Sequence, residues 1–292
     1  METIVIKNHK IIENTTSKEL IFNNHQLTFP NKALYESPLK ITLLEDNNDE
    51  LEIIIGNNSD VKIILEVRDD SKLKSDYKIK LVVNKNSNVK YLLIAALESK
   101  EAVVNHEFFV DKDSNLDLLA GLVSDVLTAK IDVKVAGEGA NVKIKAVAVS
   151  SDNNNQVIDV YMNHMAPNTI GDMTNIGIAN KKGRVVLNGV ERIEKGMKNA
   201  NVYQTLKGII TSDDAIIEVN PILLIDEYDI KAGHAATVGK IEEEALYYLQ
   251  SRGLTKKDAE KLVINGFLRP VIDEIEDEEL KTRFVELVNL RI

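Results

Sequence analysis

The chain has 292 residues, of which 44% are hydrophobic and 28% are charged, and this composition argues against a disordered or membrane-embedded protein. The formal net charge of −10 disfavours a nucleic-acid partner, because a phosphate backbone would be repelled by most of the surface. The absence of cysteine excludes disulfides, thiolate metal sites and cysteine nucleophiles.

The first forty residues contain two short strand candidates, Ile4–Ile6 and Leu20–Phe22, between Asn-rich turns. We expect residues 1–40 to form an N-terminal cap. The start of the sequence lacks the basic residues and apolar run of a signal peptide, and no later stretch approaches the ~20 apolar residues of a membrane-spanning helix. These features predict a cytoplasmic protein.

A turn signature recurs four times between residues 49 and 159, and the first apolar residue of each copy is Val61, Val89, Leu116 or Val142. The steps of 28, 27 and 26 residues are typical of solenoid repeats. A weaker copy at Thr169-Ile170 would add another step of 28 residues.

Apolar and polar residues alternate within each repeat, which indicates half-buried strands. With roughly two strands in each repeat, the pattern favours a coil of a β-helix. An antiparallel meander with similar turns remains the alternative. Further strand-like segments at residues 184–187, 201–206 and 215–219 extend the predicted β-helix core over residues 41–231.

The period changes to a helical one after the core, so residues 232–292 are predicted to form a C-terminal helical domain. A first helix would end before Gly253. A second would begin at the N-cap Thr255 and end near Gly266, and two more would follow Pro270. Such a tail could cap the solenoid or dock a partner.

Few residues suggest chemistry of their own. The segment Gly233–Ile241 has the wrong spacing for a phosphate-binding loop, and Ile241 stands where Ser or Thr would hold Mg²⁺. His9, His25 and His106 are expected at the surface. His234 follows an acidic run and is a candidate metal ligand, although a turn-ordering role is favoured from spacing alone.

The end of the sequence resembles the SufB/SufD family of iron–sulfur cluster assembly scaffolds. The resemblance rests on Gly233–Gly239, on Leu246–Leu254, on Ala259 with Gly266-Phe267, and on Asn220–Ile225, and it covers roughly residues 160–290. It implies a right-handed parallel β-helix with a C-terminal helical domain. It also implies pairing between solenoids and binding of the ATPase SufC through the helices.

In this family the position that matches His234 is implicated in handling iron or clusters at the subunit interface. The resemblance therefore makes His234 a possible iron or cluster ligand, with a transient iron–sulfur cluster shared with the partner subunit. Three departures favour a short, SufD-like version: the chain has Ala232 and no thiol near His234, Ala235 replaces an acidic residue, and the N-terminal helical region of longer members is missing or reduced.

The sequence thus predicts a non-catalytic scaffold subunit that binds a SufC-like ATPase and pairs with a SufB-like subunit or with itself. Three points stay open: whether the partner is a second copy or a SufB-like paralogue, what His164 does, and whether a flavin is bound. One alternative is a homodimeric β-solenoid adaptor for another ABC-type ATPase, unconnected with iron–sulfur assembly. A third possibility is an enzyme with a cleft formed by His164, Asp226 and Asp229.

Overall fold

The computed structural model describes residues 2–44, 48–69, 74–97, 99–273, 275 and 278–291, which form nineteen strands and three helices. Sheet A contains β1 (Glu2–Lys7), β2 (Lys10–Asn14), β5 (Leu39–Leu44), β7 (Asp60–Asp69), β9 (Asn88–Leu97), β11 (Asn115–Leu122), β13 (Asn141–Ser150), β15 (Ile170–Ala179), β17 (Asn201–Ile210) and β19 (Lys231–Lys240). Sheet B contains β3 (Ile21–Asn23), β4 (Gln26–Phe29), β6 (Asn48–Ile55), β8 (Lys74–Val83), β10 (Glu101–Val110), β12 (Leu127–Val135), β14 (Asn155–His164), β16 (Arg184–Ile193) and β18 (Ile216–Ile225). The helices are α1 (Glu243–Ser251), α2 (Lys256–Ile272) and α3 (Glu278–Arg291).

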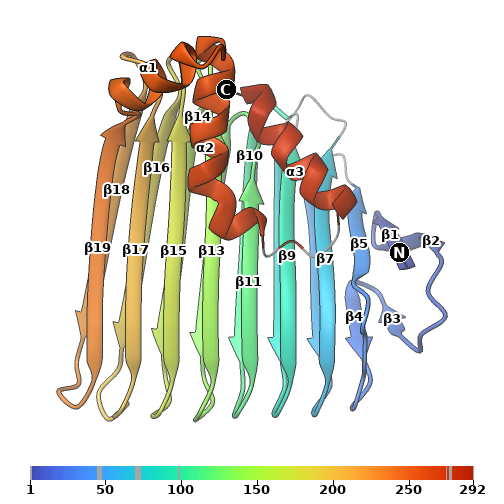
Figure 1. The fold of residues 1–292 in the computed structure, drawn as a ribbon. Coiled ribbons are helices and arrows are strands. Elements are labelled where there is room, and N and C mark those ends of the chain that lie inside the picture. Colours follow the sequence, from blue (N-terminus) through green and yellow to red (C-terminus); the bar gives the residue numbers. More distant parts are fainter. Residues whose placement is uncertain are drawn as a thin grey trace.

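The two sheets face each other as the walls of a parallel β-solenoid of about seven turns (Figure 1). Each coil contributes one strand to each sheet, and every strand from β5 onward pairs in parallel with the strand one coil away. The predicted solenoid is therefore confirmed. The antiparallel meander is wrong, because antiparallel pairing occurs only in β1–β2 and β3–β4 among the described strands.

The repeated turn signature has a structural cause. Asn58, Asn86 and Asp113 adopt positive φ angles of 56°, 57° and 54°, a conformation that Asn and Asp tolerate better than most residues. A buried serine follows each of them, and its hydroxyl accepts a hydrogen bond from the backbone N–H of the preceding coil, as from Ser59 to Ser87 at 3.1 Å. The repeat thus encodes both the turn and the contact between coils.

The core lies between the two sheets and consists mostly of Ile, Val and Leu. Val61 and Ile63 of β7 are buried, and Lys62 between them faces outward, as the alternation predicts. The fifth repeat departs from the prediction by one residue. Val142 pairs with Gly171, 29 residues later, so Ile170 lies on the outer face with 44% of its surface exposed.

The two ends of the solenoid differ. At the N-terminal end, the short strands β2 and β3 fold back antiparallel to β1 and β4 and are the outermost strands of the two sheets. At the C-terminal end, β18 and β19 are the outermost strands, and no described strand pairs with their outer edges. The predicted end of the β-helix near Lys231 is wrong, because β19 pairs with β17 as far as Lys240 and the first helix begins at Glu243.

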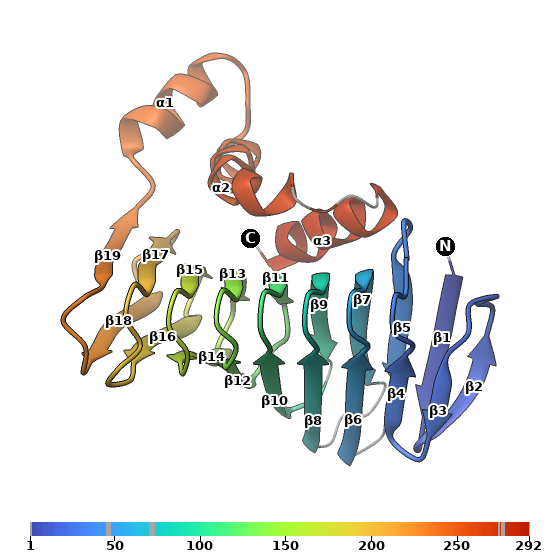
Figure 2. The same cartoon turned by 90° about the horizontal axis from the view of Figure 1, so that it is seen from below.

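The helical tail returns over the outer face of sheet A, and α1 stands away from that face beside the last strands (Figure 2). Helices α2 and α3 bury a second apolar cluster against sheet A that includes Ile264, Leu268 and Phe284. Gly121 permits this contact, because a Cβ at that position would lie 2.7 Å from the Phe284 ring. The tail is therefore packed onto the solenoid, while α1 buries none of its residues.

The predicted break at Gly266 is also wrong. Helix α2 begins after the N-cap Thr255, as expected, but continues through Gly266 and Pro270 to Ile272. Local propensity argues for an end at Gly266. The burial of Leu268, Val271 and Ile272 against sheet A outweighs that preference, because tertiary packing supplies most of the stability of a helix in a protein.

Candidate functional site

The open C-terminal end of the solenoid concentrates exposed apolar side chains. Each of the following is at least 40% exposed and lies on β17, β18, β19 or the turn before β19: Tyr203, Ile216, Ile222, Leu224, Ile225, Tyr228 and Val238. Because β18 and β19 also present unpaired backbone groups along their outer edges, this end can extend each sheet by pairing with a strand of another chain. Exposed apolar residues beside a strand edge are typical of a protein interaction surface.

His234 lies within this open end. It occupies β19 opposite Gln204 of β17, on the face of sheet A whose earlier residues line the core, yet it is exposed because no further coil covers it. The sequence placed His234 at a junction between strand and helix, and the structure instead places it inside a strand. Ala232 and Ala236, its neighbours on the same face, supply no further metal ligand.

The acidic run before β19 has a structural role. Glu227 accepts hydrogen bonds from the backbone N–H groups of Gly196, Tyr228 and Asp229 at 2.8, 2.9 and 3.3 Å. These N–H donors lower the pKa of the Glu227 carboxyl below its usual value. The bonds order the turn that presents the fully exposed Tyr228 beside the open end.

The structure does not bring together the residues of the enzymatic alternative. His164 is fully buried. Its Nδ1 atom lies 2.8 Å from Thr169 Oγ1, and its Nε2 atom lies 3.4 Å from Glu191 Oε2. Asp226 and Asp229 lie in the exposed turn between β18 and β19. These three residues therefore do not form the cleft that a paired-acid mechanism would require.

The expectation of a surface position for His106 is wrong. His106 lies on the core face of β10, where its Nε2 atom is 2.7 Å from the Tyr91 hydroxyl and its ring stacks on Phe108. Burial lowers the pKa of His106 to about 3. The alternation of Ala102, Val104, His106 and Phe108 along the strand is the sequence signal that would have placed it in the core.

A second exposed region lies on the helical tail. Tyr247 and Tyr248 of α1 are 75% and 57% exposed, and Phe267 of α2 is also largely exposed. The guanidinium of Arg252 lies 5.3 Å from the centre of the Tyr248 ring. Aromatic and Arg side chains dominate the binding energy of many protein interfaces, so this surface can dock another protein.

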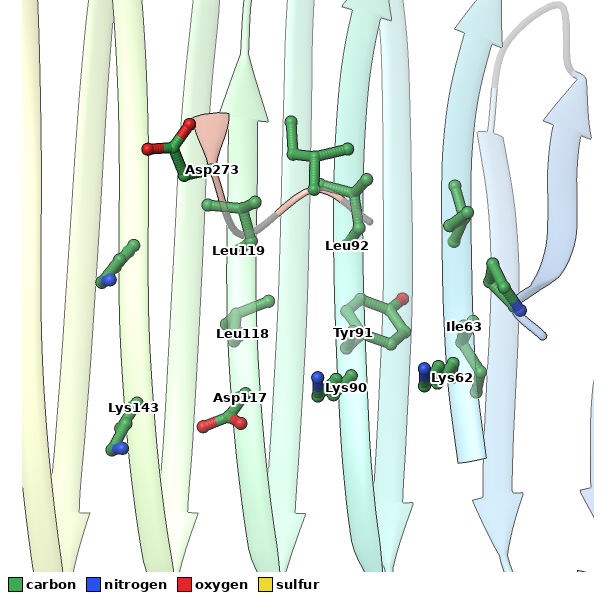
Figure 3. Close-up of a pocket in the computed structure, with 14 residues that line it drawn as sticks. Lys62, Ile63, Lys90, Tyr91, Leu92, Asp117, Leu118, Leu119, Lys143 and Asp273 are labelled. Atoms are coloured by element: carbon green, nitrogen blue, oxygen red, sulfur yellow. The ribbon is translucent and has the colours of Figure 1, made fainter. Parts of the chain in front are cut away.

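A pocket of about 380 Å³ lies between the outer face of sheet A and the connection from α2 to α3. Figure 3 shows Lys62, Lys90, Asp117 and Lys143 along neighbouring strands, with Leu92 and Leu119 beside them and Asp273 from the tail above. Its volume is within the range of small-molecule sites. The lysines favour an anionic group next to an apolar one.

Among the residues that the structure describes, no group of three or more His, Cys, Asp and Glu side chains converges as a metal site. In the same part of the chain, no helix is both long and apolar enough to cross a membrane.

Comparison with known proteins gives a consistent result. Residues 45–267 match the family described as SUF system FeS cluster assembly, SufBD core domain. The chain is 34% identical to the iron–sulfur cluster assembly protein SufD of Bacillus subtilis over 182 residues, which are 62% of this chain and 42% of that protein. It is 26% identical over 199 residues, or 68% of this chain, to SufBD family proteins of Staphylococcus epidermidis and Mycobacterium leprae, of which it covers 43% and 23%. The chain thus spans less than half the length of these curated relatives.

Proposed function

Because this chain belongs to the SufBD family of the SUF iron–sulfur cluster assembly system, we propose that it is a non-catalytic scaffold subunit of a SUF complex. The open end of the solenoid is the observation that carries this proposal. A scaffold must present surfaces to its partners, and this end combines unpaired strand edges with exposed Ile, Leu and Tyr side chains. We assign this end to pairing with a SufB-like subunit or with a second copy of the chain.

The helical tail would bind a SufC-like ATPase. Deletion of residues 240–292 is a poor test, because it would expose the apolar face of sheet A that α2 and α3 cover. The substitutions Tyr247→Ala and Tyr248→Ala remove exposed side chains and leave that face covered. In a pull-down with the cognate ATPase, the double variant should retain less than a tenth of the wild-type binding, which is the loss expected when interface aromatics are truncated.

A matched control for this experiment is Leu290→Ala, which truncates an exposed side chain of α3. The control should bind the ATPase as the wild type does. Undiminished binding by the tyrosine variant would contradict the assignment of α1 to the ATPase.

His234 would take part in holding iron or a nascent cluster at the subunit interface, where a partner must supply the remaining ligands because the chain contains no thiol. The variant His234→Ala should fold normally, since the side chain is exposed, and should lower cluster formation on the assembled complex. Cluster formation is measured by absorption and iron content. A wild-type cluster yield would remove His234 from this role.

The alternative of an adaptor unconnected with iron–sulfur assembly is not favoured, because the family match extends over most of the solenoid and into α2.

A further inference from the structure

A buried ionisable pair lies between the sheets in the last coils of the solenoid. His164 of β14 and Glu191 of β16 have no exposed side-chain surface, and His164 Nε2 lies 3.4 Å from Glu191 Oε2. Neither carboxylate oxygen of Glu191 nor His164 Nε2 has a hydrogen-bond partner among the described residues. Buried polar atoms without hydrogen-bond partners are destabilising, so this pair requires a physical explanation.

The Thr169 hydroxyl lies 3.2 Å from the Ala166 carbonyl and 2.8 Å from His164 Nδ1. When its single proton is donated to that carbonyl, Thr169 Oγ1 accepts a hydrogen bond from His164 Nδ1. In the neutral imidazole, Nε2 then presents a lone pair toward the Glu191 carboxylate. Two acceptors that face each other need a proton or a metal cation between them.

The separation of the two atoms suits a metal cation better than a proton. A charge-assisted N–H···O bond is about 2.7–2.9 Å long, which is shorter than the 3.4 Å observed. Two ligand atoms at about 2.1 Å from a tetrahedral ion lie about 3.4 Å apart. The pair is therefore spaced as two ligands of one ion would be.

A third donor atom lies beside the pair. Met162, which precedes His164 by two residues on the same face of β14, is the register partner of Glu191. A Cβ at Gly171 would lie 2.6 Å from His164 Nε2 and 2.8 Å from Met162 Sδ, so the glycine leaves both atoms next to the same small space.

Gln204 is a further buried polar side chain in these coils. Its Nε2 atom lies 3.4 Å from Met173 Sδ, and its Oε1 atom lacks a hydrogen-bond partner among the described residues.

We infer that His164, Glu191 and Met162 form a buried site for one divalent first-row transition-metal ion. Imidazole, carboxylate and thioether donors together suit ions such as Fe²⁺, Co²⁺ or Zn²⁺ and not Mg²⁺ or Ca²⁺, which prefer oxygen ligands alone. The site is separate from His234, which lies one coil or more beyond it on the exposed end of sheet A. It does not depend on the proposed scaffold function.

Cobalt(II) is a suitable probe, because its ligand-field absorption reports the donor atoms directly. The full-length chain is unfolded in urea, refolded with Co²⁺ so that the ion can reach the core, and dialysed before its metal content and visible spectrum are measured. We expect one retained ion per chain, visible absorption bands that depend on His164, and a higher melting temperature than that of the chain refolded without metal.

The isosteric variant Glu191→Gln should weaken Co²⁺ binding at least ~100-fold, because loss of even an outer-shell group typically costs 10–100-fold. His164→Asn should abolish the bands. The control variants His234→Ala and His106→Gln should keep the ion, which separates this site from surface histidines and from cluster handling. Failure to retain an ion, or full retention by both Glu191→Gln and His164→Asn, would overturn the inference and leave a shared proton as the explanation of the pair.

Discussion

Buried serines join successive coils at one corner of the solenoid. Ser87 donates to the Gly56 carbonyl at 2.9 Å and accepts from the N–H of Ser59 at 3.1 Å, and Ser114 repeats the arrangement one coil later. These serines were part of the repeat that the sequence revealed, and their role in contacts between coils follows from the structure. At the fourth copy Ala140 takes the position, and the backbone N–H of Asn141 still donates to the Ser114 carbonyl at 2.9 Å.

Substitution of Ser87 by Ala should destabilise the protein by about 1–3 kcal/mol, because it leaves a buried N–H and a buried carbonyl without this partner. The midpoint of urea unfolding, followed by circular dichroism, measures the effect. Ser251→Ala removes a hydroxyl from an exposed position and should leave the midpoint unchanged. Equal midpoints for the two variants would contradict a stabilising role of the serine contacts.

His106 should make stability depend on pH in a defined window. Its pKa is about 3 in the folded chain and near the ordinary 6.5 in the unfolded chain. Between these values the unfolded chain binds a proton that the folded chain does not, so stability falls as the pH is lowered below about 6.5. Protonation of this one group in the unfolded chain should lower the free energy of unfolding by about 2 kcal/mol at pH 5 relative to pH 7.

His106→Gln is the variant that isolates this effect, because the amide oxygen can still accept from the Tyr91 hydroxyl and does not titrate. The difference in unfolding free energy between wild type and variant should shift by about 2 kcal/mol in favour of the variant from pH 7 to pH 5. If the unfolding free energies of the two proteins change in parallel with pH, His106 is not the source of the pH dependence.

At the scale of elements, the strands were readable from the sequence and the ends of elements were not. Alternation and the turn repeat located β7, β9, β11, β12 and β13, because each depends on local spacing. The end of the solenoid was placed too early, since the small residues of Gly233–Gly239 show little strand pattern and β19 is held by pairing with β17. Pairing and packing between distant segments leave no local signal.

Phe284 should hold the helical tail against sheet A. It is buried on Gly121 and belongs to the cluster that joins α2 and α3 to the sheet. Phe284→Ala should weaken this contact by about 3–5 kcal/mol, because it removes a large buried ring. We expect faster hydrogen exchange and earlier proteolysis in α2 and α3, with unchanged exchange in the solenoid strands.

Leu290→Ala is the control for that experiment, because it truncates a side chain of α3 that is 81% exposed. The control should exchange and resist proteolysis as the wild type does. Equal protection of α2 in the Phe284 variant would mean that the tail is held by other contacts, such as Arg291 to Asp125 at 2.9 Å.

At the scale of the whole molecule, the sequence predicted the architecture but not the chemistry inside it. A repeat of 26 to 28 residues defines a solenoid, because each coil needs only its neighbours. The meeting of His164 and Glu191 could not be predicted in the same way. They lie 27 positions apart in a region where the repeat length increases, and a shift of one residue would move either side chain to the other face.

The asymmetry between the two ends of the solenoid predicts how the protein associates. The N-terminal end finishes in two short antiparallel strands, β2 and β3, whereas Ile222 and Leu224 lie exposed on the ten-residue strand β18 at the open end. A charge on these side chains should block pairing there without affecting the core, because they point away from it. If the chain forms a dimer with itself, the double variant Ile222→Glu and Leu224→Glu should therefore have half the mass of the wild-type dimer in light scattering. If the chain co-purifies with a SufB-like subunit, the same variant should separate from that subunit.

The same substitution at Leu290 provides the matched control, because it adds a charge at an exposed position of α3. Helix α3 lies over sheet A, whereas β18 belongs to sheet B (Figure 2). Leu290→Glu should keep the mass of the wild-type assembly. If the β18 variant also keeps that mass while its melting temperature stays at the wild-type value, the open end is not the pairing surface. In that case the exposed aromatic residues of α1 and α2 become the stronger candidate for every protein contact.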